Sequence, residues 1–514
     1  MAKIKMYSRG LGLRMAILIT CQIAFVLFGY NQGVFSGIIN NEDFLNIVNH
    51  PRAGMLGFLV SIYNLGCFFG TFIAFMTTDR LGFQKSMWFS MVYVVVGGTV
   101  QTCSYSLTQL LISRFVNGIG TGIMSTLVPV YQAELCEARK RGKLVCSLPL
   151  AVGVGIVLAY WFDYGMTYVT GSISWRLPIA CQEIFAVLVV ILVAGLPESP
   201  RWLYRKGRNE EALQVLCEVY DRAPDHPKVL AESEGILQAL ELESARGEYR
   251  WSQIFLKRDD LQTGRRVLMA YGLQFINQMG GTNIIVFYVT TVLQDNVGLT
   301  AKTSSLVGGV IQIMFVIGRI YLDIFVHKTQ KINHIALGSL YPTLYADRLG
   351  RRNPMMWGSF GLGSCMLMLA ILFSFEGTSQ AKPTATAAVA FFFLFMLIFG
   401  ASTNCIPWPY GPELLPLHAR TKGQSIGVSA NWLWNFFVAM ITPILLEKLR
   451  WKTYLIFMCL NFSFIPLIYF FYPETANLTL EEIDGLFLRD SLKAHHTEER
   501  QSKGHSEVIV EKIG

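Results

Sequence analysis

The chain has little charge and no paired cysteines. Charged residues make up 15% of its 514 residues, whereas a typical soluble domain has roughly a quarter. A soluble enzyme is therefore a poor explanation for it. The ten cysteines are scattered without paired spacing, which argues against a disulfide framework or a cysteine metal site. The apolar segments hold no cluster of His, Cys and carboxylates, so we expect no metal, no cofactor and no enzymatic activity.

Long hydrophobic segments dominate instead. The chain is 52% hydrophobic, with a mean hydropathy of +0.41. A membrane-spanning helix needs about 20 apolar residues. Suitable segments lie near 13–38, 54–78, 86–105, 108–132, 144–163, 177–196, 266–293, 304–326, 355–375, 385–410, 425–446 and 453–472. The sequence therefore predicts an all-α multi-pass membrane protein with twelve transmembrane helices in two six-helix bundles, with the lipid bilayer as partner.

Basic residues mark one side of the membrane. Lys and Arg gather at the N-terminus and in the second, fourth, eighth and tenth loops, although Lys448, Arg450 and Lys452 run against the trend. Because cytoplasmic loops carry the excess of Lys and Arg, both termini are expected in the cytosol, and the membrane is expected to be the plasma membrane. The net charge of +8 then reflects topology, and we expect no nucleic-acid partner.

The sequence predicts four parts: two apolar bundles, a polar linker between them and a polar tail. Residues 1–196 are expected to form an N-terminal six-helix bundle and residues 264–472 a C-terminal one. The linker, residues 197–263, shows helical spacing of leucines and predicts short amphipathic helices on the cytosolic side. The tail, residues 473–514, is polar and expected to be largely disordered.

Three short signatures occur once in each half of the chain. They are Asp79-Arg80-Leu81-Gly82 and Asp347-Arg348-Leu349-Gly350, Glu134 with Arg141 and Glu413 with Arg420, and Pro197-Glu198-Ser199 and Pro473-Glu474-Thr475. The copies are offset by 268, 279 and 276 residues. Such a repeat in an apolar chain is how many transporters are built.

Carboxamides and indoles lie inside several spans, where polar groups are costly and tend to be functional. The seventh span holds Gln274, Asn277, Gln278 and Asn283; Trp408 lies in the tenth, and Asn431 and Asn435 in the eleventh. Amides donate and accept hydrogen bonds without net charge, and an indole offers a flat apolar face. The set is therefore typical of a site for a small neutral sugar or polyol. The alternative is that each amide only bridges two helices.

Along nearly its whole length the chain resembles the sugar porter family of the major facilitator superfamily, in its fungal sugar and polyol transporter branch. The matching motifs are Gly29-Tyr30-x-x-Gly33, Asp79-Arg80-x-Gly82, Arg114-x-x-x-Gly118-x-Gly120-x-Gly122, Pro197-Glu198-Ser199-Pro200-Arg201-Trp202, Gln278-x-x-Gly281-x-Asn283, Asp347-Arg348-x-Gly350-Arg351-Arg352, Pro407-Trp408 and Pro473-Glu474-Thr475. The resemblance implies two pseudo-symmetric bundles, a sugar site at the midplane and alternating access. Gln278, Asn283, Trp408 and Asn435 match sugar-contacting positions of the family.

The repeated charged signatures then acquire a role as a cytosolic gate. We expect ion pairs between the halves that hold the gate shut when the site faces outward. The candidate residues are Asp79, Arg80, Glu134, Arg141, Glu198, Asp347, Arg348, Glu413, Arg420 and Glu474. The alternative is ordinary charged surface, where isolated pairs contribute little.

Two departures from the family pattern bear on mechanism. Many proton-coupled relatives have Asp where this chain has Asn31, near Arg114, and an amide cannot titrate. Pro149 stands where relatives often have a sugar-binding Gln. The interpretation is facilitated diffusion of a monosaccharide, first of all a hexose, by a monomer. The alternatives are a proton-coupled sugar or polyol symporter and a sugar sensor that does not transport.

The eighth span contains a surplus of residues. Asn31 and Asp79 are 48 residues apart, whereas Asn283 and Asp347 are 64 apart. The charged segment 319–338 accounts for the excess, and charge within a span is costly. We interpret it as a retained intron or a gene-model error. If the segment is real, residues 304–326 would serve as the span.

Overall fold

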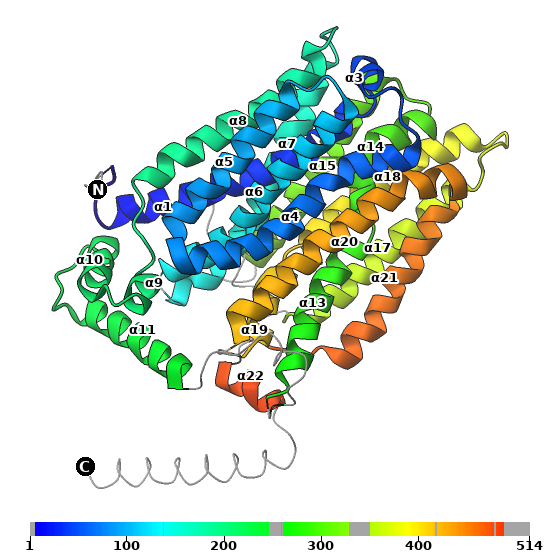
Figure 1. Cartoon of the computed structure of the whole chain (residues 1–514). Coiled ribbons are helices and arrows are strands. Elements are labelled where there is room, and N and C mark those ends of the chain that lie inside the picture. The colour runs from blue at the N-terminus through cyan, green and yellow to red at the C-terminus, as the bar shows by residue number, and fades with distance from the viewer. Residues whose placement is uncertain are drawn as a thin grey trace.

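The computed structural model of the chain (Figure 1) describes residues 6–136, 138–245, 259, 261–327, 350–416, 419–476, 478 and 480–487. These residues form α-helices joined by short connections, with no strand among them. The all-α class predicted from hydropathy is confirmed.

We call residues 6–196 the N-terminal half. Its long helices run side by side and are joined by short connections (Figure 1). In chain order they are α1 (Leu11–Gly33), α4 (Ala53–Leu81), α5 (Phe83–Thr102), α6 (Leu107–Glu134), α7 (Ala138–Met166) and α8 (Ile173–Ala194). Two short helices, α2 (Phe35–Ile38) and α3 (Glu42–Ile47), lie between α1 and α4.

We call residues 261–476 the C-terminal half. Its helices repeat the arrangement with two interruptions. They are α13 (Thr263–Met279), α14 (Thr282–Asp295), α15 (Ala301–His327), α17 (Arg352–Phe373), α18 (Ala381–Ala401), α19 (Pro407–Leu414), α20 (Arg420–Leu449) and α21 (Lys452–Phe471). Three helices, α9 (Pro200–Arg205), α10 (Asn209–Tyr220) and α11 (Pro227–Ala245), follow the first half, and α22 (Leu480–Phe487) follows the second.

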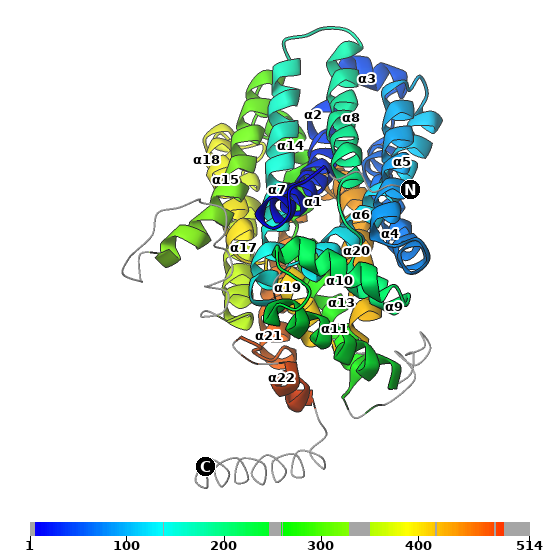
Figure 2. The ribbon, with the colours of Figure 1, turned by 90° about the vertical axis from the view of Figure 1, so that its left-hand side faces the viewer.

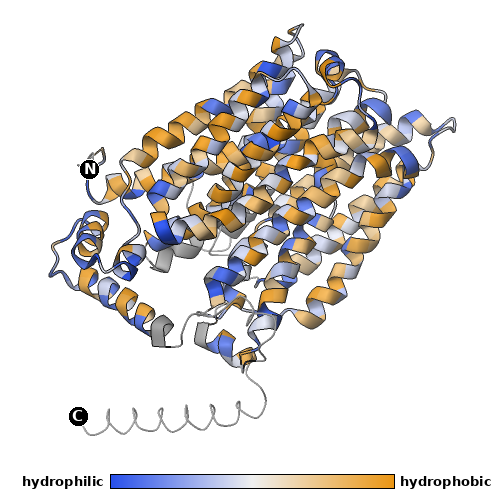
Figure 3. Ribbon diagram, in the orientation of Figure 1, coloured by the Kyte–Doolittle hydropathy of each residue, from blue (hydrophilic) through white to orange (hydrophobic). Residues whose placement is uncertain are grey.

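The long helices suit a bilayer. Ten helical segments of the described chain are long and apolar enough to cross one. Helix α5, with 20 residues, is also long enough to cross a bilayer. Helices α13 and α14, with 17 and 14 residues, are each too short alone, but together they are long enough. Large apolar side chains such as Ile184, Trp357 and Phe470 are 65–74% exposed, and hydrophobic residues predominate along the long helices (Figure 3). Lipid is the solvent in which such a surface is stable.

The glycines of α6 allow close helix packing. A Cβ added at Gly118 would fall on the backbone of Tyr63 in α4, and one at Gly122 would fall on that of Cys67. Helices approach this closely in membranes through small residues. Gly118 and Gly122 thus pack α6 against α4, and Gly120 between them lies against Ser90 of α5.

The two halves meet along two pairs of helices, α4 with α20 and α7 with α15. Helices α9–α11 and α22 lie together at one end of the molecule, which we call the linker end; α2 and α3 lie at the opposite end (Figures 1 and 2). At the opposite end the halves are joined by hydrogen bonds. Thr290 of α14 donates to the Ser36 carbonyl (2.5 Å), and Asn40 contacts both Thr290 (3.3 Å) and Thr291 (3.1 Å).

Three segments differ from the sequence-based expectation. The seventh span is not one helix, because it breaks at Gly280–Gly281, and the tenth breaks between Ala401 and Pro407. In the eighth, α15 extends from Ala301 to His327, close to the alternative span at 304–326. The rest of segment 319–338, from residue 328 on, lies outside the described residues.

The linker and the tail also differ in detail. The predicted amphipathic spacing holds in α10, where Leu216 and Tyr220 are at most 9% exposed. In α11, Val229 is buried and Leu240 packs against the same cluster, whereas Leu230 and Leu237 are 43% and 39% exposed. The tail is predicted to be largely disordered, beyond Leu488 in particular, and residues from 488 on lie outside the described residues. Its residues 480–487 form α22, in which Asp484 pairs with Arg266 of α13 (2.6 Å).

Candidate functional site

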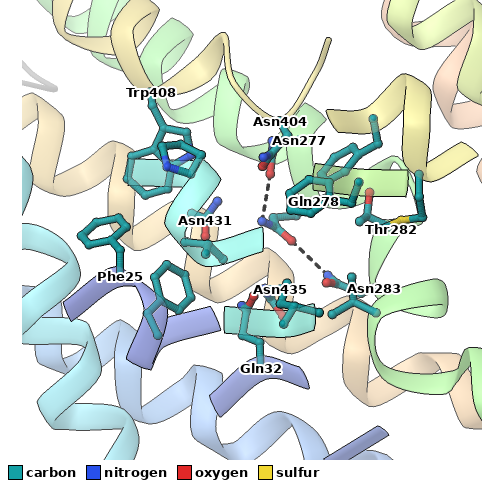
Figure 4. A pocket seen from close by; sticks show the side chains of 18 residues that line it. Phe25, Gln32, Asn277, Gln278, Thr282, Asn283, Asn404, Trp408, Asn431 and Asn435 are labelled. Carbon is teal, nitrogen blue, oxygen red and sulfur yellow. Dashed lines mark hydrogen bonds between the residues drawn. The ribbon is translucent and has the colours of Figure 1, made fainter. Parts of the chain in front are cut away.

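A cavity lies between the halves (Figure 4). Helices α1 and α7 of the N-terminal half form one wall, and α13, α14, α15, α18, α19 and α20 form the other. Its lining residues are Phe25, Phe28, Gln32, Pro149, Val152, Ile156, Asn277, Gln278, Thr282, Asn283, Val286, Phe315, Met396, Phe399, Asn404, Trp408, Asn431 and Asn435. Six of the seven residues predicted to bind substrate line this cavity; Gln274 does not.

The break between α13 and α14 creates the polar part of the wall. Gly281 has φ +91°, a conformation that side-chain-bearing residues rarely adopt, and an added Cβ would lie 2.9 Å from Met366. Asn461 of α21 donates to the Gly280 carbonyl (2.9 Å), which the broken helix leaves without a helical partner. The break brings Gln278, at the end of one helix, beside Asn283, at the start of the next.

Three amides form a hydrogen-bonded chain at this break (Figure 4). Asn283 donates to Gln278 Oε1 (3.0 Å), Gln278 donates to Asn277 Oδ1 (2.9 Å), and Asn277 donates to the Thr403 carbonyl (2.8 Å). Each amide group has two N–H donors and two acceptor lone pairs, and this chain uses only one donor of each. The side chains are therefore held in place while retaining capacity to bind hydroxyl groups.

The other predicted binding residues have partners of different kinds. Asn431 donates to Gln274 (2.8 Å), so Gln274 holds a residue of the cavity wall without lining the cavity itself. Asn435 accepts from Asn64 of α4 (2.8 Å), a hydrogen bond between the halves. The Trp408 indole lies edge-on to Phe25 of α1, with ring centroids 6.5 Å apart.

Asn31 and Arg114 are buried but do not line the cavity. Asn31 donates to Asn117 of α6 (3.4 Å), and Asn117 donates to Gln182 of α8 (2.8 Å). The Arg114 guanidinium donates to the Val60 carbonyl (2.7 Å) and lies 3.6 Å from the centre of the Phe35 ring. These contacts place both residues in a polar core within the N-terminal half.

At the linker end of the N-terminal half, the repeated signatures build a cap. Glu198 accepts hydrogen bonds from the backbone N–H groups of Phe83 (2.8 Å) and Gln84 (3.3 Å), at the start of α5. Gly82 has φ +85°, and a Cβ there would fall on the Glu198 carboxylate. Burial raises the pKa of Glu198, and these N–H groups oppose the shift. Ser199 donates to Glu134.

The C-terminal half repeats this cap and has an arginine at the position that Phe83 occupies in the first copy. Glu474 accepts from the N–H groups of Arg351 (2.7 Å) and Arg352 (3.0 Å), at the start of α17, and Thr475 donates to Glu413 (2.9 Å). Arg351 also forms a two-pronged ion pair with Glu413 (3.1 and 2.9 Å). The equivalent position in the first copy is Phe83, which packs against Tyr131.

The remaining gate candidates are placed in part. Asp79 pairs with Arg205 (3.5 Å), both half-exposed, and Arg80 is exposed. Arg420 is near the Leu415 carbonyl (3.5 Å). Asp347, Arg348 and the side chain of Arg141 lie outside the described residues. The pairs Asp79–Arg205 and Arg351–Glu413 each lie within one half or its adjoining linker; ion pairs between the halves stay a prediction for another state of the protein.

Some lining residues were not predicted from the sequence. Gln32 follows Asn31 in the polar run of the first span, and Asn404 follows Ser402 and Thr403 at the break in the tenth. Both runs carried a signal, because consecutive polar residues within a span are costly. The apolar residues Phe25 and Phe28 carried none.

Two halves of membrane-length helices around a central amide-lined cavity define a membrane transporter fold. The structure is similar to the inward-open conformation of the xylose transporter XylE from E. coli, with a TM-score of 0.72 and 22% identity over 92% of this chain and 99% of the other. It is also similar to the proton:xylose symporter XylE bound to 6-bromo-6-deoxy-D-glucose, with a TM-score of 0.74 and 23% identity over 92% and 99% of the two chains. These similarities confirm the major facilitator fold.

The family model described as sugar (and other) transporter matches residues 16–329 and 335–487. The chain belongs to this family, the sugar porters of the major facilitator superfamily. It is 35% identical to the MFS-type transporter oryC of Aspergillus oryzae, over 92% of this chain and 85% of that protein. It is 32% identical to the sugar transporter STL1 of Saccharomyces cerevisiae, over 93% and 82%. The match is interrupted at residues 330–334, inside segment 319–338.

Proposed function

We propose that this protein carries a monosaccharide, first of all a hexose, across the plasma membrane by alternating access. The observation that carries the proposal is the amide chain Asn283–Gln278–Asn277 facing the cavity between the halves. Uncharged amides suit hydroxyl groups, and Trp408 offers an indole for the C–H face of a sugar ring. A fungal relative, 28% identical over 90% of this chain and 79% of its own length, is named as the high-affinity hexose transporter HXT6 of Saccharomyces cerevisiae.

The two halves are the moving units of this proposal, with the boundaries 1–196 and 264–472 and the cytosolic parts 197–263 and 473–514. The linker end faces the cytosol, because the basic loops gather there. The contacts of Ser36 and Asn40 with α14 then close the outer mouth. Opening that mouth requires these hydrogen bonds to break, and the cytosolic gate residues would pair between the halves in that state. The protein works as a monomer, without a cofactor.

Transport is by facilitated diffusion. Asn31 cannot carry a proton, and its amide is held by Asn117 within the N-terminal half. Proton-coupled symport of a sugar or polyol is the second candidate, because Asp163 is a buried carboxylate in α7 that accepts the Gly37 N–H (3.2 Å). A sugar sensor would bind at the same cavity without transport.

The test is uptake by the purified full chain in liposomes. Radiolabelled D-glucose should enter saturably, at rates that neither an imposed pH gradient nor an uncoupler changes. Uptake that stops with the uncoupler would favour the symporter and overturn the facilitator. Saturable binding without uptake would favour the sensor, and absence of both for hexoses, pentoses and polyols would overturn the proposal.

A further inference from the structure

The N-terminal half contributes few polar groups to the cavity lining. Of the six described residues that it contributes, only Gln32 is polar, whereas seven of the twelve from the C-terminal half are amide or hydroxyl side chains. We call the side formed by α1 and α7 the apolar wall. Another amide of the N-terminal half, Asn64 of α4, does not line the cavity, yet it contacts a residue that does.

This contact joins Asn64 to Asn435 of α20. The Asn64 side chain is fully buried (0% exposed), and its Nδ2 donates to Asn435 Oδ1 (2.8 Å). Asn435 lines the cavity (Figure 4). The other lining amides with described hydrogen bonds are held by groups of their own half; they are Asn277, Gln278, Asn283 and Asn431. Among the described residues, Asn435 is thus the lining amide of the C-terminal half that is held from the other half.

The helix that carries Asn435 is also held against the N-terminal half. The buried Trp432 indole donates to Ser125 Oγ of α6 (3.2 Å), and its ring centroid lies 4.9 Å from that of Phe28. With the helix fixed, the side-chain torsions decide which end of the Asn435 amide faces the cavity. Asn64 determines this orientation, because its donor requires the Asn435 carbonyl to face α4. The N–H groups of Asn435, which donate to no described residue, are then available to the cavity.

The environment of Asn64 indicates that its amide does more than fill space. Its Oδ1 is buried without a hydrogen-bond partner among the described residues, and an unpaired buried acceptor is unfavourable. Leucine has nearly the same shape and would leave no group unpaired at this position. Polar side chains within spans are costly and tend to be functional. The hydrogen bond to Asn435 is the contact that such a function would use.

We infer that Asn64 is a positioning residue for sugar binding, which turns the N–H groups of Asn435 toward the cavity. The inference rests on the proposed function, because it concerns the same site. In this orientation Asn435 recognises an oxygen of the solute as a hydrogen-bond acceptor. A fixed donor also rejects an analogue that lacks this oxygen, because the N–H groups would be left unpaired, whereas an amide that is free to rotate can turn away. Asn64 thereby sets the selectivity for one hydroxyl group without touching the sugar.

The test measures selectivity in the purified full chain by isothermal titration calorimetry. The ligands are D-glucose and its deoxy analogues, each lacking a different hydroxyl group. Asn435→Ala should abolish the preference for glucose over the deoxy analogue at one carbon, which identifies the hydroxyl group that Asn435 binds. Asn64→Leu should lower the ratio of glucose to deoxy affinity several-fold at the same carbon and leave the ratios at the other carbons unchanged.

The direction of the hydrogen bond is tested with the deoxyfluoro analogue at that carbon. Fluorine can accept a hydrogen bond but cannot donate one, so the fluoro sugar should bind to the unchanged protein more tightly than the deoxy sugar. Equal binding of the two contradicts the assigned orientation of Asn435.

Ser61→Ala is the matched control variant. Ser61 lies one turn before Asn64 on α4 and is equally buried, but its hydroxyl donates to the Phe58 carbonyl of the same helix (3.3 Å). This variant should leave every ratio unchanged. Because each ratio is measured within one variant, partial loss of folded protein does not affect it.

The outcomes separate this inference from the proposed function. If Asn64→Leu weakens all ligands equally, the hydrogen bond only joins the halves, and the inference is overturned while the proposed function stands. Unchanged ratios in Asn64→Leu overturn it as well. Absence of glucose binding to the unchanged protein overturns both.

Discussion

The N-terminal and C-terminal halves share one architecture but differ in chemistry at two places. At the linker end of each half, a glutamate carboxylate accepts a hydrogen bond from a backbone N–H group at the start of a helix: Glu198 at α5 and Glu474 at α17. In the C-terminal copy Arg351 forms an ion pair with Glu413, whereas the equivalent position in the N-terminal copy is Phe83, which packs against Tyr131. At the cavity, the C-terminal half again supplies most of the polar groups.

The comparison shows which features of a duplicated unit both copies keep and which only one copy has. The caps depend on backbone geometry, at the positive φ of Gly82 and Gly350, and both copies retain it. The break at Gly281, which brings Gln278 beside Asn283, has no equally sharp counterpart inside a long helix among the residues that the structure describes in the first half. There α1 passes into α2 through Val34, whose backbone is helical. We infer that the C-terminal half binds and the N-terminal half provides an apolar surface to close against.

Replacing the glycine at the break should have the largest effect on this comparison. Gly281→Ala places a Cβ at φ +91°, within 3.0 Å of Met366 and Phe457. The left-handed backbone alone costs about 1–2 kcal/mol, and the crowding adds to it. We expect a clear loss of thermal stability, measured by fluorescence-detected size exclusion, and loss of transport.

Gly280→Ala is the matched control for this variant. Its backbone is right-handed (φ −65°), and the nearest atom to an added Cβ, outside its own helix, is 3.4 Å away. Its stability should stay close to that of the unchanged protein. If both variants lose stability equally, the left-handed backbone at Gly281 is not the cause of the loss.

The linker-end difference can be tested by making the second copy resemble the first. Arg351→Phe removes the two-pronged ion pair and leaves Glu413 with Thr475 as the partner described above. We expect a loss of about 1–3 kcal/mol, because a largely buried carboxylate loses its charged partner. The measurement is again thermal stability in detergent.

A second substitution separates charge from packing at this position. The double variant Arg351→Phe, Glu413→Gln should recover part of the loss, because the uncompensated charge is gone. Absence of any recovery would mean that Arg351 contributes through packing alone.

The exposed pair Asp79–Arg205 should matter least. Its side chains are 53% and 46% exposed, and pairs of this kind contribute about 0–1 kcal/mol. Arg205→Ala should change thermal stability little, and added salt should change it little further. A loss as large as that of Arg351→Phe would show that this pair belongs to a larger network.

Hydropathy predicted the positions of the membrane-spanning helices, but it could not predict where the backbone of a helix breaks. Averaging over about 20 residues finds a span but cannot locate a break of two residues, so α13 and α14 were expected as one helix. The spacing of Gln274 and Gln278 predicts a shared face, yet the cavity reaches only Gln278, because Gln274 is covered by Asn431. The apolar wall could not be predicted, since an apolar residue that faces a cavity has no sequence mark that separates it from one in the core.

The most direct test of the central claim measures glucose binding to two amide variants of the full chain. Gln278→Ala removes the middle of the amide chain in the C-terminal half, and Gln32→Ala removes the polar group of the opposite wall. Calorimetry of each with D-glucose should show affinity falling roughly 10- to 100-fold for Gln278→Ala, as expected for about 1–3 kcal/mol, and much less for Gln32→Ala. Equal losses, or a larger loss for Gln32→Ala, would contradict the account that the C-terminal half binds the sugar.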